Sequence, residues 1–322
     1  METFHDYRDF PASLLTSLTI GNFDGLHRGH REILNKLLAI ARQSGTRSLV
    51  VTFSPHPLQI LQPSKAPKSI LLQDEKIQKI REAGIDYLLD LRFDRAFSKL
   101  SGESFIREVL VGSLHARHVL VGEDFVFGHR RSGDVGLLRR LSSELGYVVD
   151  ILEPVIIRGK RVSSTWIREL ILNGRISDAN RLLGGYYHLC GEVIPGDKLG
   201  QTRLVPTLNL APQHELIPQM GVYVTRAAIE GRTYRAVTNI GTRPTVSGKS
   251  LRIETYLINE SLGTTPRFME IEFLHRLRDE MSFPSIEALK IQIQKDVLRA
   301  IRFFTRLELF RKGELPGATS LE

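Results

Sequence analysis

A glycine-rich segment with two histidines three residues apart is the first part of this sequence that could do chemistry. Residues 21–30 read GNFDGLHRGH and lie between an expected strand at 14–20 and an expected helix at 29–43. Glycines let the backbone approach a ligand, and a helix N-terminus offers N–H groups with partial positive charge. On a helical turn, His27 and His30 can face one anion and stabilise charge that grows on a phosphoryl group. The alternatives are a turn with two surface histidines and, without a third suitably spaced ligand, a metal pair.

A second segment, rich in hydroxyl groups, opens a later helix. Residues 162–168 read VSSTWIR, and an apolar run follows them. Hydroxyls at a helix start either cap it or bind a phosphate there. Arg168 lies about one turn further on, where its guanidinium can reach the same anion. Capping alone is the common explanation, but a second such segment beside the histidine loop favours a phosphate site.

The elements that must position these segments fall into two parts of an α/β chain. Up to residue 184, short apolar strands alternate with helical patterns, which predicts a parallel sheet covered on both faces. Ligands of such sheets bind beyond the carboxyl ends of the strands. Strand-like runs separated by turns then predict an antiparallel barrel or sandwich, closed by an amphipathic helix with Ser285 as its N-cap. We expect domains over residues 1–184 and 185–310, and a tail over 311–322.

Composition excludes several classes of protein. The 322 residues are 42% hydrophobic and 25% charged, as in ordinary soluble proteins of about two domains. A single cysteine, Cys190, excludes a disulfide framework and a zinc cluster of several thiolates. The sequence has no run of about 18 apolar residues, and its acidic start argues against a signal peptide, so we expect a cytoplasmic protein. A formal charge of +8 suits anionic partners or is a basic solvated surface.

Four segments together resemble the bacterial bifunctional riboflavin kinase/FAD synthetases, which are HxGH nucleotidyltransferases. The resemblance implies a Rossmann-like first domain that transfers an adenylyl group. The FMN phosphate attacks the α-phosphorus of ATP and pyrophosphate leaves, without a covalent enzyme intermediate. The segments are GNFDGLHRGH at 21–30, TFSPHP at 52–57, VGEDFVFGHRRSGD at 121–134 and SSTWIREL at 163–170.

The resemblance also implies which residues of the first domain bind ATP. His27 and His30 would contact its phosphates as the catalytic pair. The remaining expected ATP contacts are Gly21, Phe23, Asp24, Gly29, Ser164, Thr165 and Arg168, the last three on the β and γ phosphates.

Three residues of the first domain are expected near the flavin. Asp124 would lie near the nucleotide and the flavin. Phe125, like Phe127, could flank a planar ring, and core packing explains either residue equally well. His56, between two prolines, either lies in the flavin pocket or only stiffens a turn.

Residues 187–309 resemble the riboflavin kinase module. Glu254 of IETYL at 253–257 matches the family's general base, which takes the proton of the riboflavin 5′-hydroxyl. The alternative is that Glu254 is an ordinary strand residue. Thr207 and Asn209 of PTLN at 206–209 would hold the ATP-bound Mg²⁺, which prefers oxygen ligands. Three other segments carry the resemblance. GEVIPGDKLGQT at 191–202 contains the expected ATP contacts Gly196, Lys198 and Thr202. TNIGTRPT at 238–245 contains Arg243, which is either a flavin or phosphate ligand or part of a structural ion pair, and the third segment is EFLHRLRDEMSFPSIEAL at 272–289.

Two departures from the family's pattern fall in this module. Leu204 stands where relatives have glycine, and the loop 259–267 lacks the usual Tyr-Gly pair. Because the Thr207 and Asn209 positions keep their metal-binding types, we expect an active kinase in which Leu204 has a negative φ and points away from ATP.

The resemblance therefore implies an enzyme that phosphorylates riboflavin to FMN and adenylylates FMN to FAD, with Mg²⁺ and ATP. The alternative is an FMN adenylyltransferase whose barrel only binds flavin. An RNA-binding relative of the HIGH-type synthetases would need a lysine-rich second signature and a large anticodon module, and the sequence has neither. The expected partners are riboflavin, FMN, FAD and ATP, without nucleic acid or membrane, and the chain is expected to be a monomer or weak homo-oligomer.

Overall fold

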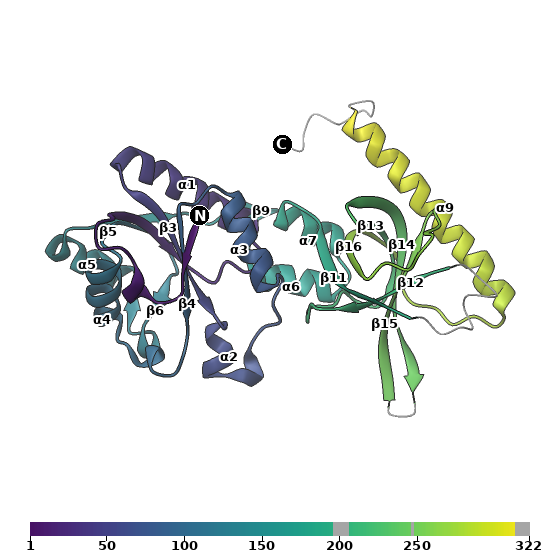
Figure 1. Ribbon diagram of the computed structural model, residues 1–322, viewed down its shortest axis with the longest axis horizontal. Coiled ribbons are helices and arrows are strands. Elements are labelled where there is room, and N and C mark those ends of the chain that lie inside the picture. The colour runs from purple at the N-terminus through teal and green to yellow at the C-terminus, as the bar shows by residue number, and fades with distance from the viewer. Residues whose placement is uncertain (196–205, 246–247, 313–322) are drawn as a thin grey trace. The chain divides into compact units, whose positions relative to one another are not determined.

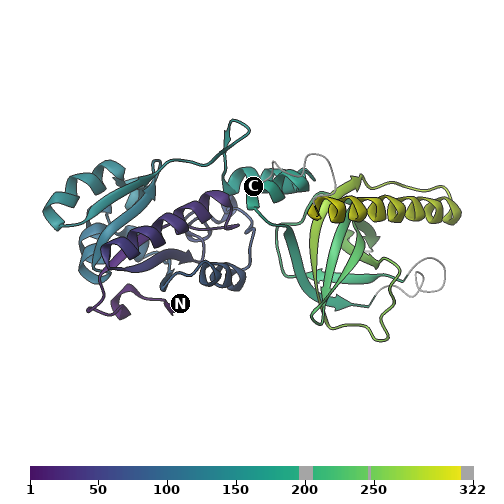
Figure 2. The same cartoon turned by 90° about the horizontal axis from the view of Figure 1, so that it is seen from above.

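The computed structural model describes residues 1–195, 206–245 and 248–312 (Figures 1 and 2). Contacts between residues divide the chain into two compact units, Met1–Trp166 and Ile167–Glu322. The sequence predicts a domain boundary at residue 184, whereas this division falls inside a helix near residue 166. Over the described residues, no helix is long and apolar enough to cross a membrane.

The first unit contains the predicted parallel sheet. All five strand pairings in this six-stranded sheet are parallel, so this prediction is confirmed. The central strands are buried on both faces, as their apolar runs require. The strand order is β1 (Glu2–Phe4), β4 (Tyr87–Arg92), β3 (Arg47–Ser54), β2 (Thr16–Ile20), β5 (Ala116–Gly122) and β8 (Val148–Leu152).

Helices cover both faces of this sheet (Figure 1). Successive side chains of a strand point to opposite faces. Val50 packs in a cluster with α1 (Arg28–Ser44) and α3 (Gln73–Glu82), whereas Leu49 and Val51 pack with α5 (Val135–Leu145) and η4 (Phe105–Ser113). The helices are α1 (Arg28–Ser44), α2 (Pro57–Leu61), α3 (Gln73–Glu82), α4 (Gly102–Ser104), the π-helix η4 (Phe105–Ser113) and α5 (Val135–Leu145). Shorter elements are η1 (Tyr7–Asp9), η2 (Pro63–Lys65), η3 (Phe97–Lys99), η5 (His129–Arg131), and the ribbons β6 (Val126–Phe127) with β7 (Gly133–Asp134) and β9 (Ile156–Ile157) with β10 (Lys160–Arg161).

The second unit is a closed antiparallel barrel, so the prediction of a barrel or sandwich resolves to the barrel. Inside it, the hydroxyl groups of Thr225, Thr238 and Thr255 form a ladder with oxygen–oxygen distances of 2.8 and 2.9 Å. The strand order is β11 (Tyr187–Ile194), β12 (Leu208–Pro212), β15 (Gly248–Leu257), β14 (Arg232–Thr245), β13 (Gly221–Ile229) and β16 (Phe268–Arg278).

A long terminal helix, α9 (Ile286–Arg311), lies along the barrel wall (Figure 2). Ser285 is its N-cap, as predicted, because its hydroxyl accepts the N–H of Ala288 at 3.1 Å. The buried face of α9 includes Ala300 and Phe304, which pack with barrel residues such as Val224. The helix therefore closes the hydrophobic core of this unit.

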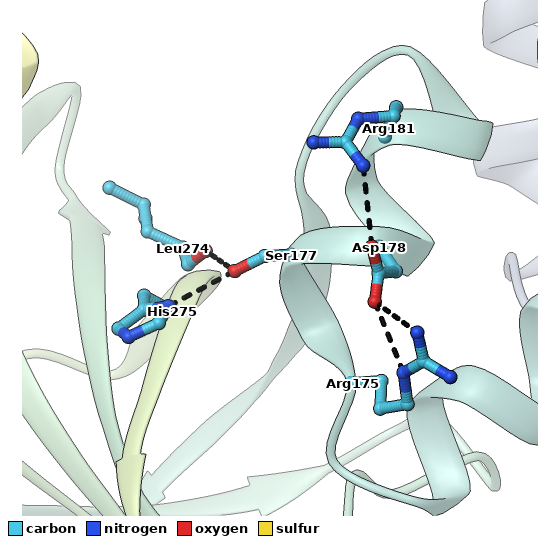
Figure 3. A network of polar contacts seen from close by, with 6 residues as sticks. All are labelled: Arg175, Ser177, Asp178, Arg181, Leu274 and His275. Carbon is cyan, nitrogen blue, oxygen red and sulfur yellow. Dashed lines mark hydrogen bonds and ion pairs between the residues drawn. The ribbon is translucent and has the colours of Figure 1, made fainter. Parts of the chain in front are cut away.

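Helix α7 (Ile176–Leu183) is attached to the barrel, although it precedes residue 184. Figure 3 shows Ser177, whose hydroxyl lies 3.3 Å from the Leu274 carbonyl and 3.1 Å from Nδ1 of His275. The amide of Asn180 donates to the Phe273 carbonyl at 2.8 Å and accepts the Tyr187 N–H at 2.8 Å. Ion pairs on the surface of α7 join Asp178 to Arg175 and Arg181 (Figure 3). Helix α6 (Ser164–Leu172) precedes α7 in the chain.

We predict that Asn180→Ala destabilises the second unit by about 2–4 kcal/mol, because it leaves two buried backbone groups without partners. The loss is measured by urea denaturation. The control is Ser177→Ala on the same helix, which removes a partly exposed hydroxyl and should cost less than about 1 kcal/mol. Equal stabilities of the two variants would contradict the anchoring role of Asn180.

Candidate functional site

The loop between β2 and α1 turns through three residues with positive φ. Phe23 has φ 49°, Gly25 has φ 85° and Leu26 has φ 36°. Non-glycine residues in this region cost free energy, and such strain is held only where the surrounding structure demands it. Phe23 and Leu26 are 1% and 3% exposed, so burial of their side chains holds the turn in place. The turn delivers the loop to the carboxyl ends of the central strands, where parallel sheets bind ligands.

His27 and His30 lie together at the N-terminus of α1. Their rings are stacked, with centroids 3.7 Å apart and planes 12° apart. The N–H of His30 donates to Nδ1 of His27 at 3.3 Å, so His27 is the N-cap of the helix. At Gly29 a Cβ would lie 3.2 Å from the His27 ring, so a residue without a side chain suits this stack. The structure thus brings together the two histidines that the sequence pairs.

The His30 side chain is half-buried, and its surroundings disfavour a proton on the ring. Burial, the charge of His27 and the charge of Lys76 together hold the pKa of His30 well below its ordinary value. The Nδ1 atom of His30 is buried and has no hydrogen-bond partner among the described residues. A polar atom left without a partner in a buried site favours a ligand group that completes its hydrogen bonding.

Asp24 and Ser164 join the histidine loop to the hydroxyl-rich segment. The Ser164 hydroxyl donates to the Asp24 carbonyl at 2.8 Å. The Asp24 carboxylate accepts the N–H groups of Ile70 and Leu71 at 2.9 and 3.2 Å. This carboxylate therefore fixes the chain at residues 70–71, and its expected contact with ATP stays a prediction.

The start of α6 carries the other hydroxyl groups. The Ser163 hydroxyl accepts the Trp166 N–H at 3.3 Å, so capping explains this serine. Thr165 is exposed and Arg168 is half-buried one turn later. Capping therefore explains Ser163, and the expected phosphate contacts of Ser164, Thr165 and Arg168 stay a prediction.

His56 contacts this loop, whereas Asp124 contacts Arg161. Nδ1 of His56 accepts the Leu58 N–H at 3.2 Å as the N-cap of α2, and its Nε2 lies 3.1 Å from the Asn22 amide. The imidazole thus stiffens a turn and also touches the loop. Asp124 is exposed and pairs with Arg161 at 2.7 Å.

Phe125 and Phe127 stack on each other with centroids 5.2 Å apart and pack against the core of the first unit. Core packing, one of the two interpretations of these rings, is what the structure contains. A contact of Phe125 with flavin stays a prediction.

Sequence reasoning missed Lys76, a buried lysine beneath the loop. It is 8% exposed, and its Nζ lies 3.4 Å from the Asn22 carbonyl and 3.3 Å from the Thr52 hydroxyl. The signal was its position four residues before the buried Ile80, on the apolar face of an otherwise charged helix.

A second polar group lies on the barrel wall. Glu254 on β15 is directly opposite Asn209 on β12 and Asn239 on β14, so the three side chains share one face. Nη1 of Arg252 lies 3.2 Å from the Glu254 carboxylate. Asn209 is 7% exposed, and Thr207 is exposed just before β12. Barrel pairing thus brings the predicted base and a predicted metal ligand side by side.

The other predicted residues of the second unit are Arg243, Gly196, Lys198, Thr202 and Leu204. Arg243 lies in β14, on the strand that carries Asn239. The remaining ones, Gly196, Lys198, Thr202 and Leu204, lie outside the described residues.

Comparisons with known proteins match both units. The family model described as FAD synthetase matches residues 12–166, and the one described as riboflavin kinase matches residues 183–304. A bifunctional riboflavin kinase/FMN adenylyltransferase of Escherichia coli K12 is 37% identical over 288 residues, which cover 89% of this chain and 92% of that protein. Its namesake in Haemophilus influenzae is 35% identical over 289 residues, or 89% and 94% of the two chains.

Among solved structures, one titled as a macrolide-efflux protein from Streptococcus pneumoniae matches almost the whole chain. It is 27% identical with a TM-score of 0.81, and the match covers 91% of this chain and 96% of that one. The order of both units is therefore found in an experimental structure.

Proposed function

Since this chain belongs to the family of bifunctional riboflavin kinases and FMN adenylyltransferases, we propose the residues through which each of its two units acts. The chain phosphorylates riboflavin to FMN with ATP, and it transfers an adenylyl group from ATP to FMN to give FAD and pyrophosphate. Both halves match their family models, and nothing supports the alternative of a barrel that only binds flavin.

The adenylyltransferase site lies at the N-termini of α1 and α6. The stacked pair of His27 and His30 supports this assignment most directly, because two imidazoles at a helix N-terminus can donate to a phosphate. In the reaction the FMN phosphate attacks the α-phosphorus of ATP in line with the leaving pyrophosphate. The chain contributes positioning and stabilisation of the charge on the phosphorus oxygens.

Hydrogen-bond donors at the start of α6 hold the outer phosphates in this proposal. Thr165 is exposed at the first turn, and Arg168 brings a charge one turn later. Ser164 ties this turn to the loop through the Asp24 carbonyl. The two helix N-termini then share one triphosphate, whose negative charge both favour.

Riboflavin phosphorylation takes place at Glu254. Its carboxylate accepts the proton of the riboflavin 5′-hydroxyl, which then attacks the γ-phosphorus of ATP. The guanidinium of Arg252 lies 3.2 Å away and holds this carboxylate in place on the barrel wall. The cross-strand pairing of Glu254 with Asn209 carries this proposal, because it sets a base beside a carboxamide oxygen.

The residues around Asn209 fit Mg²⁺. Hard oxygen donors suit this ion, and a carboxamide, a threonine hydroxyl and a nearby carboxylate supply them. Asn209 and Thr207 would hold the ion. When bound, Mg²⁺ neutralises charge on the ATP phosphates.

The enzyme is proposed to act in the cytoplasm as a monomer or weak homo-oligomer. The single cysteine supports a reducing compartment, since a protein of oxidising compartments commonly carries disulfides. Its ligands in this proposal are riboflavin, FMN, FAD and ATP.

We predict that His30→Ala lowers the rate of FAD formation by about 10²–10³ and leaves FMN formation intact, because it removes one preorganised contact in the first unit only. Chromatography of flavins over time, with riboflavin or FMN as the starting substrate, measures both rates. Equal loss of the two activities in a folded variant would refute the assignment of separate sites.

For Glu254→Gln we predict the converse result, in which FMN formation is lost and FAD formation is kept. The amide keeps the shape but cannot accept the proton, so FMN formation should fall by about 10²-fold or more. Supplied FMN should still become FAD at the wild-type rate. A variant that phosphorylates riboflavin normally would reduce Glu254 to an ordinary strand residue.

A further inference from the structure

We propose that Lys76 is a positioning residue of the adenylyltransferase site, whose ammonium group braces the histidine loop from beneath. The inference rests on the proposed assignment of this loop to the ATP phosphates. It adds a residue of α3 to the ATP contacts that the sequence analysis expects in residues 21–30 and 163–168.

Lys76 holds the loop at the residue before its first strained turn. Its Nζ lies 3.4 Å from the Asn22 carbonyl, to which the Thr52 hydroxyl also donates at 3.3 Å. The same Nζ contacts that hydroxyl at 3.3 Å, which closes a triangle of polar contacts. Thr52 is fully buried, so this triangle lies inside the protein.

The direction of the Asn22 carbonyl decides how the next peptide group points. In a trans peptide the C=O and the following N–H point in opposite directions. Holding the carbonyl of Asn22 toward α3 therefore turns the N–H of Phe23 away from α3. Phe23 then adopts φ 49°, a conformation that needs support from its surroundings. Lys76 supplies part of this support.

A buried lysine at this place is costly unless its charge is compensated. Burial lowers the pKa of Lys76, and the carboxylates of Asp90 and Asp24 oppose that shift. Asp90 is 5% exposed and accepts a hydrogen bond from Gln73 at 2.8 Å. The Lys76 ammonium in turn lowers the pKa of His30, because a nearby cation repels a proton from that ring.

The charged groups around Lys76 come from several elements. Asp24 belongs to the loop, Asp90 to β4, and the imidazoles of His27 and His30 lie at the start of α1; His5 adjoins Asp90 at 3.9 Å. Two stacked imidazoles with centroids 3.7 Å apart cannot both be protonated cheaply. Lys76 thus disfavours a proton on His30, whose backbone N–H donates to Nδ1 of His27.

The test compares Lys76→Met, Lys76→Arg and Lys79→Met in the full chain. Lys76→Met should lower kcat for FAD formation about 10–100-fold, the size expected for a misplaced binding loop. Lys76→Arg keeps the charge and should restore much of that rate. Lys79→Met, a half-buried lysine one turn along the same helix, should behave as wild type. FMN formation by the second unit should not change in any variant.

A pH profile separates positioning from simple loss of structure. Without the repulsion from Lys76 the pKa of His30 rises, so the acid limb of kcat for FAD formation should move to higher pH in Lys76→Met. Loss of structure alone would lower the plateau and leave the limb in place. An unmoved limb, or a wild-type kcat, overturns the proposal.

Two further variants keep the outcome clear. His30→Ala tests the underlying site: if it loses FAD formation while Lys76→Met keeps it, only the role of Lys76 is wrong, and if His30→Ala stays active, the site assignment itself fails. Should Lys76→Met not fold, Thr52→Val decides, since it removes a partner of Nζ and keeps the charge. A loss of about fivefold or more in its FAD formation supports the brace, and a wild-type rate refutes it.

Discussion

One hydrogen bond joins two segments that lie 140 residues apart in the chain, and the geometry of the proposed adenylyltransferase site depends on it. The Ser164 hydroxyl donates to the Asp24 carbonyl at 2.8 Å. The carboxylate of the same aspartate fixes Ile70 and Leu71. The histidine loop, residues 70–71 and the start of α6 therefore meet at Asp24, which is the arrangement that the proposed ATP site requires.

In the barrel, the ladder of interior threonine hydroxyl groups positions Glu254 in a comparable way. Because side chains alternate along a strand, a register slip by one residue would turn Glu254 inward and Thr255 outward. The hydroxyl group of Thr255 bonds to that of Thr238 at 2.9 Å, which fixes the pairing of β14 with β15. A buried polar ladder thus specifies where the external carboxylate stands.

The fold predictions rested on the pattern of apolar residues, because a local run such as Leu49, Val50 and Val51 indicates a strand that is buried on both faces. The choice of barrel over sandwich needed the long-range pairing of β12 with β15, which no local pattern encodes. Motif resemblance found the histidines and Glu254. It could not find Lys76, since a lysine within a charged helix is ordinarily solvated and only the tertiary structure buries it.

The boundary between the two compact units falls inside α6, and this affects where the chain can be cut into fragments. Severing the chain at residue 166 would cut α6 between Thr165 and Arg168, leaving the expected phosphate ligands on different fragments. Severing it at 184 would instead strip α7 from the barrel. Each of these two cuts therefore separates residues that the structure holds together: the first divides α6, and the second parts Asn180 from Tyr187 and Phe273.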